Sequence, residues 1–284
     1  MKYTFGLIGT GNMGGAIARA VSQTLKDGIL SDKSLDKAQE LARELGFTAG
    51  SNQEAALESR YLFLGVKPHL MGGMLESIKA DLAACTEAPV LVSMAAGLTI
   101  AQIQEMAGLN CPIIRIMPNT PVAVGQGVVL YETSAAVTPE ILEGFLQVMG
   151  KAGQLCRLEE SLMDVGASVS GCGPAFVYMV IDAIADGGVA CGLPRPDAVK
   201  YAAQTLLGAA QMVLESGKHP AQLKNEVCSP GGSTSRGSAP WSSGGSTQPL
   251  WMRSSPPVRR TLLWASKQTR QVPAHSLCRD FFCI

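Results

Sequence analysis

The 284-residue chain has few aromatic and few charged side chains. Phe, Trp and Tyr make up 5% of it and Asp, Glu, Lys and Arg 16%, whereas 46% of the residues are hydrophobic. A core built mainly from Ala, Gly and aliphatic residues favours helices packed closely on a parallel sheet. No apolar run reaches the roughly 20 residues that a membrane span requires, and the first residues do not resemble a signal peptide. We therefore expect a soluble, cytoplasmic protein with no membrane partner.

Motifs for metal binding and redox chemistry are also missing. None of the eight cysteines forms a Cys-x-x-Cys pair, and the three histidines are not placed at metal-ligand spacing. The cysteines are expected to be small buried hydrophobic residues in a reducing compartment. This pattern predicts no metal site.

The net charge of zero hides an uneven distribution. From Ser235 onward the chain has seven basic residues and one acidic residue, a net charge of +6, so the first 234 residues carry −6. A mildly acidic body argues against nucleic acid as a partner.

The most informative motif lies in residues 3–19. A short apolar run, which indicates a strand, is followed directly by Gly9-x-Gly11-x-x-Gly14 and then by a small-residue helix that starts near Met13. In a strand–turn–helix unit the first glycine allows the tight turn, the second lets the backbone approach a pyrophosphate, and the third lets helix and strand pack closely. The segment therefore predicts a dinucleotide-binding Rossmann-like domain, a doubly wound α/β sheet.

The residues after the second expected strand, 28–31, give conflicting signals about the cofactor. An acidic residue here accepts a hydrogen bond from the ribose 2′-hydroxyl of NAD, whereas basic and hydroxyl side chains accommodate the 2′-phosphate of NADP. Asp32 favours NAD, while Lys33 and Ser34 favour NADP. We expect NADPH, with NADH as an open alternative.

Further strands are expected at residues 47–49, 61–66, 90–94, 113–117, 127–131 and 154–158, with helices at 35–45 and 139–150. Open α/β sheets bind ligands where their strands end at the carboxyl edge. Lys67 follows one strand and is equally consistent with a cofactor contact or a surface position. Pro118-Asn119-Thr120-Pro121 follows another as a rigid polar turn, which indicates a ligand contact.

From Ser161 the pattern becomes helical throughout. Long helices are expected after Pro174 and from Pro194 to Glu215, and they are apolar on so many sides that we expect them to bury surface against another subunit. A shorter helix begins at His219-Pro220, where His219 is expected to start the helix and not to act as a base. Residues 229–234, Ser-Pro-Gly-Gly-Ser-Thr, are compatible with an anion-binding nest or with a flexible linker.

Taken together, these segments resemble the pyrroline-5-carboxylate reductase family, over about residues 1–234. The resemblance rests on Gly-Thr-Gly-Asn-Met-Gly (9–14), Val-Lys-Pro (66–68), Ala-Ala-Gly (95–97), Met-Pro-Asn-Thr-Pro (117–121), Ser-Gly-Cys-Gly-Pro-Ala (170–175), Ala-Asp-Gly-Gly-Val (185–189) and Cys-Ser-Pro-Gly-Gly-Ser-Thr (228–234). It implies a Rossmann domain at 1–160 and an all-α dimerisation and substrate domain at 161–234.

The resemblance also implies a reaction, hydride transfer from NADPH or NADH to 1-pyrroline-5-carboxylate to give L-proline. The implied catalytic residues are Ser229 and Thr234, and the substrate would contact Pro121, Gly231, Gly232, Ser233 and Thr234. The residues implied to bind the cofactor are Gly9, Gly11, Asn12, Met13, Gly14, Lys33, Ser34, Asn52, Val66, Lys67, Pro68, Ala95, Ala96, Gly97 and Asn119. Family members are homodimers or higher homo-oligomers in which the helical domains of two subunits interlock, so an isolated monomer is expected to be inactive.

Residues 235–284 depart from the family, which continues with acidic, alanine-rich helices. This segment contains all three tryptophans and no Glu. It is either a basic disordered tail for an acidic partner or out-of-frame translation, since Arg, Ser, Pro and Trp are what a GC-rich gene yields in the wrong frame. We favour the frame shift. The chain is therefore expected to be either an active reductase or a defective chain that at most binds dinucleotide; a third alternative is reduction of a different small imine or carbonyl.

Overall fold

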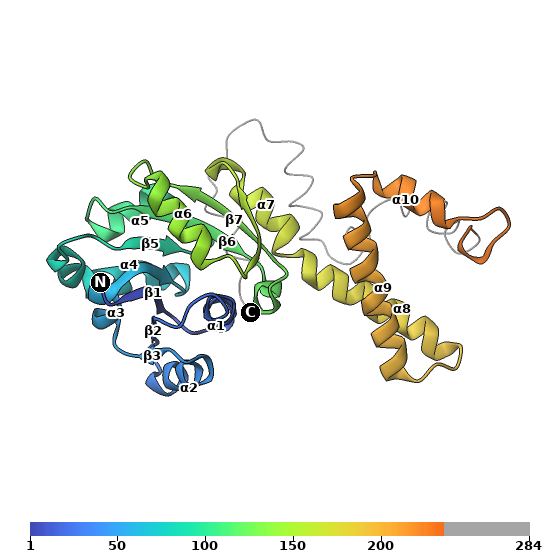
Figure 1. Cartoon of the computed structure of the whole chain (residues 1–284), viewed down its shortest axis with the longest axis horizontal. Coiled ribbons are helices and arrows are strands. Elements are labelled where there is room, and N and C mark those ends of the chain that lie inside the picture. The colour runs from blue at the N-terminus through green and yellow to red at the C-terminus, as the bar shows by residue number, and fades with distance from the viewer. Residues whose placement is uncertain (236–284) are drawn as a thin grey trace. The chain divides into compact units, whose positions relative to one another are not determined.

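The computed structural model describes residues 1–235, so the expectations for the basic tail from Arg236 onward lie outside the described residues. The described chain forms two compact units, one comprising residues 1–172 and the other beginning at Gly173 (Figure 1).

The first unit is built on an eight-stranded sheet in the order β3-β2-β1-β4-β5-β6-β7-β8. Its strands are β1 (Tyr3–Ile8), β2 (Gly28–Ser31), β3 (Thr48–Ala49), β4 (Ser59–Leu64), β5 (Val90–Ser93), β6 (Ile113–Pro118), β7 (Gly127–Thr133) and β8 (Gly153–Arg157). Neighbouring strands are parallel except for the antiparallel pair β6 and β7. Only residues 119–126 connect this pair, which is too short for the crossover that a parallel pair requires.

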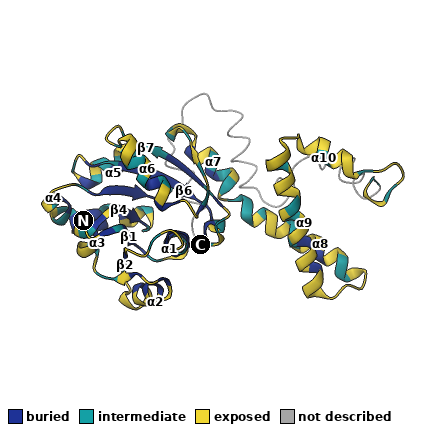
Figure 2. Ribbon diagram, in the orientation of Figure 1, coloured by how far each residue is buried: buried dark blue, intermediate teal, exposed yellow. Residues whose placement is uncertain are grey.

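Helices cover both faces of this sheet (Figure 1). Their bounds are α1 (Asn12–Ser22), α2 (Leu35–Leu45), α3 (Asn52–Glu58), α4 (Pro68–Ala84), α5 (Ile100–Ala107), α6 (Pro139–Val148) and α7 (Met163–Ser170), with the 3-10 helices η1 (Thr120–Val124) and η2 (Glu160–Leu162). One hydrophobic cluster joins α1, α2 and α6 to one face of the sheet, and a second joins α3, α4 and α5 to the other. The strands β1, β2, β4, β5 and β6 are accordingly buried along most of their length (Figure 2), as the continuous apolar sequence of a parallel sheet predicts, whereas the edge strands β3 and β8 are partly exposed.

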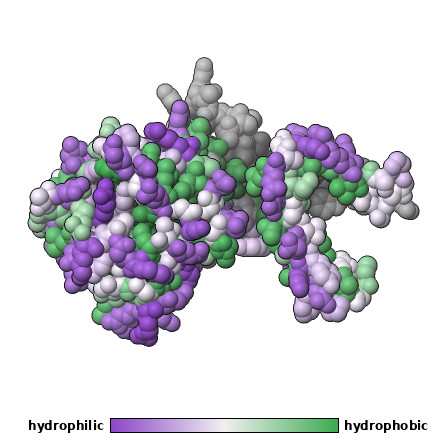
Figure 3. Space-filling view, viewed as in Figure 1, coloured by the Kyte–Doolittle hydropathy of each residue, from purple (hydrophilic) through white to green (hydrophobic). Residues whose placement is uncertain are grey.

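The second unit is helical, with α8 (Gly173–Ala190), α9 (Arg195–Ser216) and α10 (Pro220–Val227). Among the described residues of this unit, Ala185, Ala198 and Ala202 are buried. Many large apolar side chains of α8 and α9 lie on the surface instead, Leu207 at 55% and Leu214 at 79% exposure among them (Figures 2 and 3). A helix pair that exposes this much apolar surface is typical of a subunit interface.

One stretch within residues 160–190 is long and apolar enough to cross a membrane, judged by length and composition alone. The expectation that no apolar run is long enough for a membrane span therefore holds only for runs that no polar residue interrupts. Within this stretch Met163, Ala167 and Ala185 are buried, whereas the other residues of α8 are exposed or half-buried. An exposed interface helix accounts for this equally well, because it must also be apolar over many residues.

Most expected elements are present. The helix at Leu35–Leu45 and the strand at Gly28–Ser31 have the expected bounds, whereas α3, α4 and α5 were not anticipated. The first compact unit ends at Cys172 and thus includes α7, beyond the boundary expected at residue 160. Met163 and Ala167 of α7 pack on Met117 and Leu130 of the sheet, which attaches this helix to the first unit.

Candidate active site

The glycine loop between β1 and α1 is shaped by close backbone contacts. Gly9 has a φ of +102°, in the left-handed region, and a Cβ there would lie 2.6 Å from the Gly65 carbonyl oxygen. A Cβ on Gly14 would lie 2.0 Å from the Gly9 carbonyl oxygen. At Gly11, by contrast, no atom lies within 4 Å of the position of a Cβ. Gly9 and Gly14 therefore serve the fold of the loop, whereas Gly11 leaves open space in which a ligand can approach the backbone.

The amide groups of this loop have two different roles. The Gly9 N–H donates to the Ser31 carbonyl at 2.8 Å and the Thr10 N–H donates to Asp32 at 2.7 Å, so both are bound to the end of β2. The first helical hydrogen bond is donated by Gly15 to Gly11, and the amides of Asn12, Met13 and Gly14 precede it. Amides of a first helical turn lack intrahelical acceptors and bind anions. The start of α1, which carries no acidic residue in its first turn, fits a dinucleotide pyrophosphate.

Asp32 points toward the glycine loop. Its Oδ2 accepts hydrogen bonds from the Thr10 N–H at 2.7 Å and the Thr10 hydroxyl at 3.0 Å, and its Oδ1 accepts one from the Ser34 N–H at 3.0 Å. Burial by itself would raise the pKa of Asp32, but the hydrogen bonds from Ser34 and Thr10 outweigh it and the pKa is lowered. Thr10 was not among the residues expected to matter. The sequence nevertheless contained a signal for Thr10, because it lies inside the glycine motif and Asp32 follows the next strand.

The other expected cofactor residues near β2 are Lys33, Ser34 and Asn52. Lys33 and Ser34 are both exposed, and Ser34 is the residue that precedes α2, with no capping hydrogen bond from its side chain. Asn52 begins α3 and accepts a hydrogen bond from the buried Ser31 hydroxyl at 2.6 Å. Asn52 therefore ties α3 to the last residue of β2, a contact that the sequence pattern did not predict.

Two further expected segments follow β4 and β5. Val66 is half-buried and Lys67 is exposed directly before α4, whose first residue is Pro68. Ala95 is buried, Ala96 is half-buried, and Gly97 has a φ of +74°. Because β4 lies next to β1 and β5 next to β4, these segments and the glycine loop leave the sheet at the same edge. The chain reverses its winding direction at β1, between β2 and β4, which is where such sheets bind ligands.

Asn119 is only 6% exposed and uses its side chain inside the protein. Its Nδ2 donates to the Ser170 carbonyl and its Oδ1 accepts from the Val128 N–H, both at 2.9 Å. This amide therefore holds the turn after β6 against α7 and β7. Pro121 is half-buried within η1. The contacts of Asn119 with the nicotinamide and of Pro121 with the substrate remain predictions.

The other expected substrate residues, Gly231 to Thr234, belong to the second unit and follow α10. Gly231 has a φ of +70°, and the Gly232 N–H donates to the Ser229 carbonyl at 3.0 Å. The chain is helical from Ser233 to Ser235, and the Ser235 hydroxyl also donates to the Ser229 carbonyl. The segment is therefore a glycine turn that leads into residues of helical conformation, and that it forms an anion nest remains a prediction. Thr234 is exposed.

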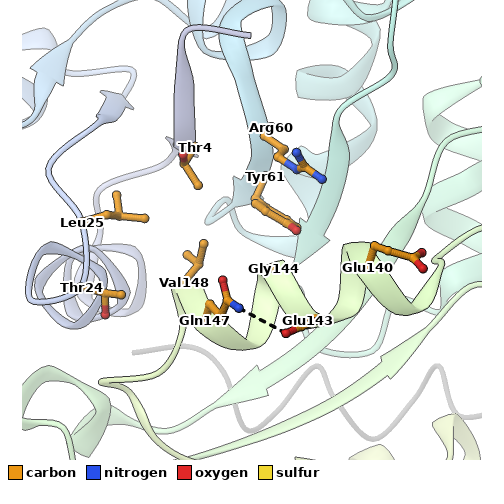
Figure 4. Close-up of a pocket in the computed structure, with 10 residues that line it drawn as sticks. All are labelled: Thr4, Thr24, Leu25, Arg60, Tyr61, Glu140, Glu143, Gly144, Gln147 and Val148. Atoms are coloured by element: carbon orange, nitrogen blue, oxygen red, sulfur yellow. Dashed lines mark hydrogen bonds between the residues drawn. The ribbon is translucent and has the colours of Figure 1, made fainter.

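A pocket of about 510 Å³ lies elsewhere in the first unit (Figure 4). It is formed near the starts of β1 and β4 and along α6, the end of the strands opposite the glycine loop. Its lining residues are Thr4, Thr24, Leu25, Arg60, Tyr61, Glu140, Glu143, Gly144, Gln147 and Val148. None of them was among the expected site residues.

Two family models match the chain. Residues 160–250 match the model for pyrroline-5-carboxylate reductase dimerisation, and residues 4–97 match the model described as NADP oxidoreductase, coenzyme F420-dependent. The first match begins just before α7 and covers all of the second unit as described. The second covers the glycine loop and the strands as far as β5.

Relatives of known identity align with most of the chain. Pyrroline-5-carboxylate reductase from Glycine max is 41% identical over 244 residues, covering 83% of this chain and 86% of its own length. The Escherichia coli enzyme of the same name is 40% identical, covering 82% and 88%. These alignments leave about a sixth of the chain unaligned.

A solved structure agrees with this assignment. The structure of pyrroline carboxylate reductase from Plasmodium falciparum with NADP bound has a TM-score of 0.78 at 28% identity, and it covers 93% of this chain and 96% of its own. With relatives about 40% identical over four-fifths of its length and a dinucleotide loop of the expected geometry, the chain belongs to the pyrroline-5-carboxylate reductase family.

Proposed function

We propose that this protein reduces 1-pyrroline-5-carboxylate to L-proline with NADPH, the last step of proline biosynthesis. The observation that carries the proposal is the roughly 40% identity to reductases of that name across both units. The open space at Gly11 and the amides at the start of α1 support it, because they suit a dinucleotide.

NADPH is the preferred cofactor in this proposal. The Plasmodium falciparum relative has NADP bound, and the family model for residues 4–97 is that of an NADP oxidoreductase. Lys33 and Ser34 are exposed where β2 ends, and a cation and a hydroxyl suit a 2′-phosphate. NADH is the second candidate.

The reduction requires positioning more than acid–base catalysis. When bound, the reduced nicotinamide supplies the hydride that adds to the carbon of the protonated C=N bond. The residues of this chain have to bind the substrate carboxylate and orient the ring. Such positioning supplies much of the reduction in the activation barrier for hydride transfer. We assign the carboxylate to the turn formed by Gly231 to Thr234, with Ser229 nearby, and the ring nitrogen to the Thr234 hydroxyl. Pro121 would contact the ring.

The active species is proposed to be a homodimer or a larger homo-oligomer in the cytoplasm. The dimerisation model matches residues 160–250, and α8 and α9 expose apolar side chains over much of their length.

Replacing exposed Leu207 with Glu is expected to weaken self-association, because it places a charge within that apolar surface. Gln204→Glu adds the same charge at an exposed polar position of the same helix and is the control. Light scattering during size-exclusion chromatography measures both.

The direct test is NADPH oxidation with 1-pyrroline-5-carboxylate, with L-proline identified by mass spectrometry. Thr234→Val is expected to lower kcat while leaving the Kd for NADPH unchanged. Activity without L-proline formation would indicate another imine or carbonyl substrate. A folded chain that binds NADPH but makes no L-proline would support the second candidate, a defective reductase, which the basic, Glu-free composition of residues 235–284 favours. Resequencing the gene and measuring the intact mass test the frame shift.

A further inference from the structure

The carboxylate of Asp32 is bound inside the protein. Two of its three hydrogen bonds come from Thr10, within the glycine loop, and the third comes from the Ser34 amide where α2 begins. A carboxylate has about four acceptor positions, so most of its capacity is used. To accept two hydrogen bonds from a ribose diol it would have to give up at least one of its bonds to Thr10 or Ser34.

The neighbouring contacts point to the same role. The Gly9 N–H donates to the Ser31 carbonyl, so two consecutive loop amides, those of Gly9 and Thr10, are bound to the last residues of the β2 segment. The Ser31 hydroxyl is in turn bound to Asn52 of α3. The end of β2 therefore fixes the first half of the loop and leaves the amides at the start of α1 for the pyrophosphate.

We propose that Asp32 is a positioning residue that holds the glycine loop through Thr10, and not the group that recognises the ribose 2′ position. This inference rests on the proposed dinucleotide site and resolves the conflict between Asp32 and its two neighbours. The residues that distinguish NADPH from NADH at the 2′ position are then Lys33, Ser34 and Lys37, which are exposed before and within the first turn of α2. Lys37 is close enough for its charge to help keep the Asp32 carboxylate ionised.

The informative variant is Asp32→Asn, which keeps the shape of the side chain. Its NH2 group must face either Thr10 or Ser34, both of which are donors, so at least one hydrogen bond is lost. We expect the Kd values for NADPH and NADH to rise together by about tenfold, with their ratio unchanged, as loss of a hydrogen bond to a charged group predicts. Thr10→Val is expected to raise the Kd values for NADPH and NADH by about threefold, whereas Thr10→Ser should leave them at the native values. The double variant Thr10→Val and Asp32→Asn should bind both dinucleotides no more weakly than Asp32→Asn alone.

Fluorescence titration of the full chain measures these constants, with the exposed carboxylate of Glu40 neutralised in Glu40→Gln as the control. Selective loss of NADH affinity in Asp32→Asn would overturn the proposal, since the carboxylate would then recognise the ribose 2′-hydroxyl. Fully additive effects of the Thr10 and Asp32 variants would overturn it too.

Amide hydrogen exchange without dinucleotide separates this inference from the proposed function. Asp32→Asn should accelerate exchange in a peptide covering residues 9–15, and Glu40→Gln should not. Unchanged exchange in Asp32→Asn would refute the positioning role whether or not the protein makes L-proline.

Discussion

The Nη2 atom of Arg115, in the middle of β6, donates a hydrogen bond to Oδ1 of Asp164, in the first turn of α7, at 3.0 Å. The Nη1 of the same guanidinium bonds Glu160 at 3.2 Å, and Glu160 also accepts the N–H of Ile100 at the start of α5. Arg115 is 3% exposed, and its Nε is buried without a partner among the described residues. A single buried cation thus connects β6 and α5 to the segment in which the dimerisation match begins.

Removing the acidic partners of Arg115 is expected to cost more stability than removing Arg115. The double variant Glu160→Gln and Asp164→Asn leaves a buried charge uncompensated, which should lower the free energy of unfolding by about 3 kcal/mol. Arg115→Met leaves two carboxylates that are already partly exposed to water, so its cost should be smaller. Urea unfolding followed by circular dichroism compares them. A larger loss for Arg115→Met would show that packing, and not charge compensation, dominates.

Two glycines of the same motif should respond differently to substitution. Gly11→Val meets open space and a φ of −62°, so the protein should fold while the Kd for NADPH rises by about tenfold or more, because the side chain occupies the ligand's approach. Gly14→Ala places a methyl group against the Gly9 carbonyl and should cost about 3 kcal/mol of stability. Thermal unfolding and dinucleotide titration measure the two effects. A folded Gly14→Ala and an unfolded Gly11→Val would reverse these assignments.

Acid should destabilise the native protein partly through Asp32. Its folded-state pKa lies below the ordinary value of 3.8, so its contribution to stability is present above that pH and is lost as the pH falls through the lower folded value. The free energy of unfolding should therefore fall more steeply below about pH 4 in the native chain than in Asp32→Asn. Urea titrations across this range test the difference, and parallel curves would contradict it.

The cysteines should differ in reactivity. Cys111 is 2% exposed, and burial raises its pKa to about 11, so its thiol should resist iodoacetamide at pH 8. Cys156 and Cys191 are exposed and should be alkylated readily. Peptide mass mapping after timed labelling assigns each site. Equal labelling of Cys111 and Cys191 in the folded protein would contradict the burial.

Local sequence patterns were sufficient for much of the fold. The apolar run before Gly9 and the helical period from Leu35 to Leu45 correspond to β1 and α2, because buried strands and amphipathic helices carry their own signatures. The antiparallel direction of β7 and the attachment of α7 to the first unit were not anticipated. The direction of β7 follows from the short connection at residues 119–126, which is too short for a parallel crossover. The attachment of α7 depends on which surfaces meet, which spacing along the chain does not encode.

The motif residues, and with them the family, were readable from the sequence alone, because glycine spacing and turn chemistry are local properties of the chain. Only the tertiary structure decided what Asp32 and Asn119 do with their polar atoms. Their hydrogen-bond partners are Thr10 and Ser34 for Asp32, and Ser170 and Val128 for Asn119. Such partners come together only when separate strands and helices pack, and a buried polar group bonds to whatever donor or acceptor that packing brings within reach.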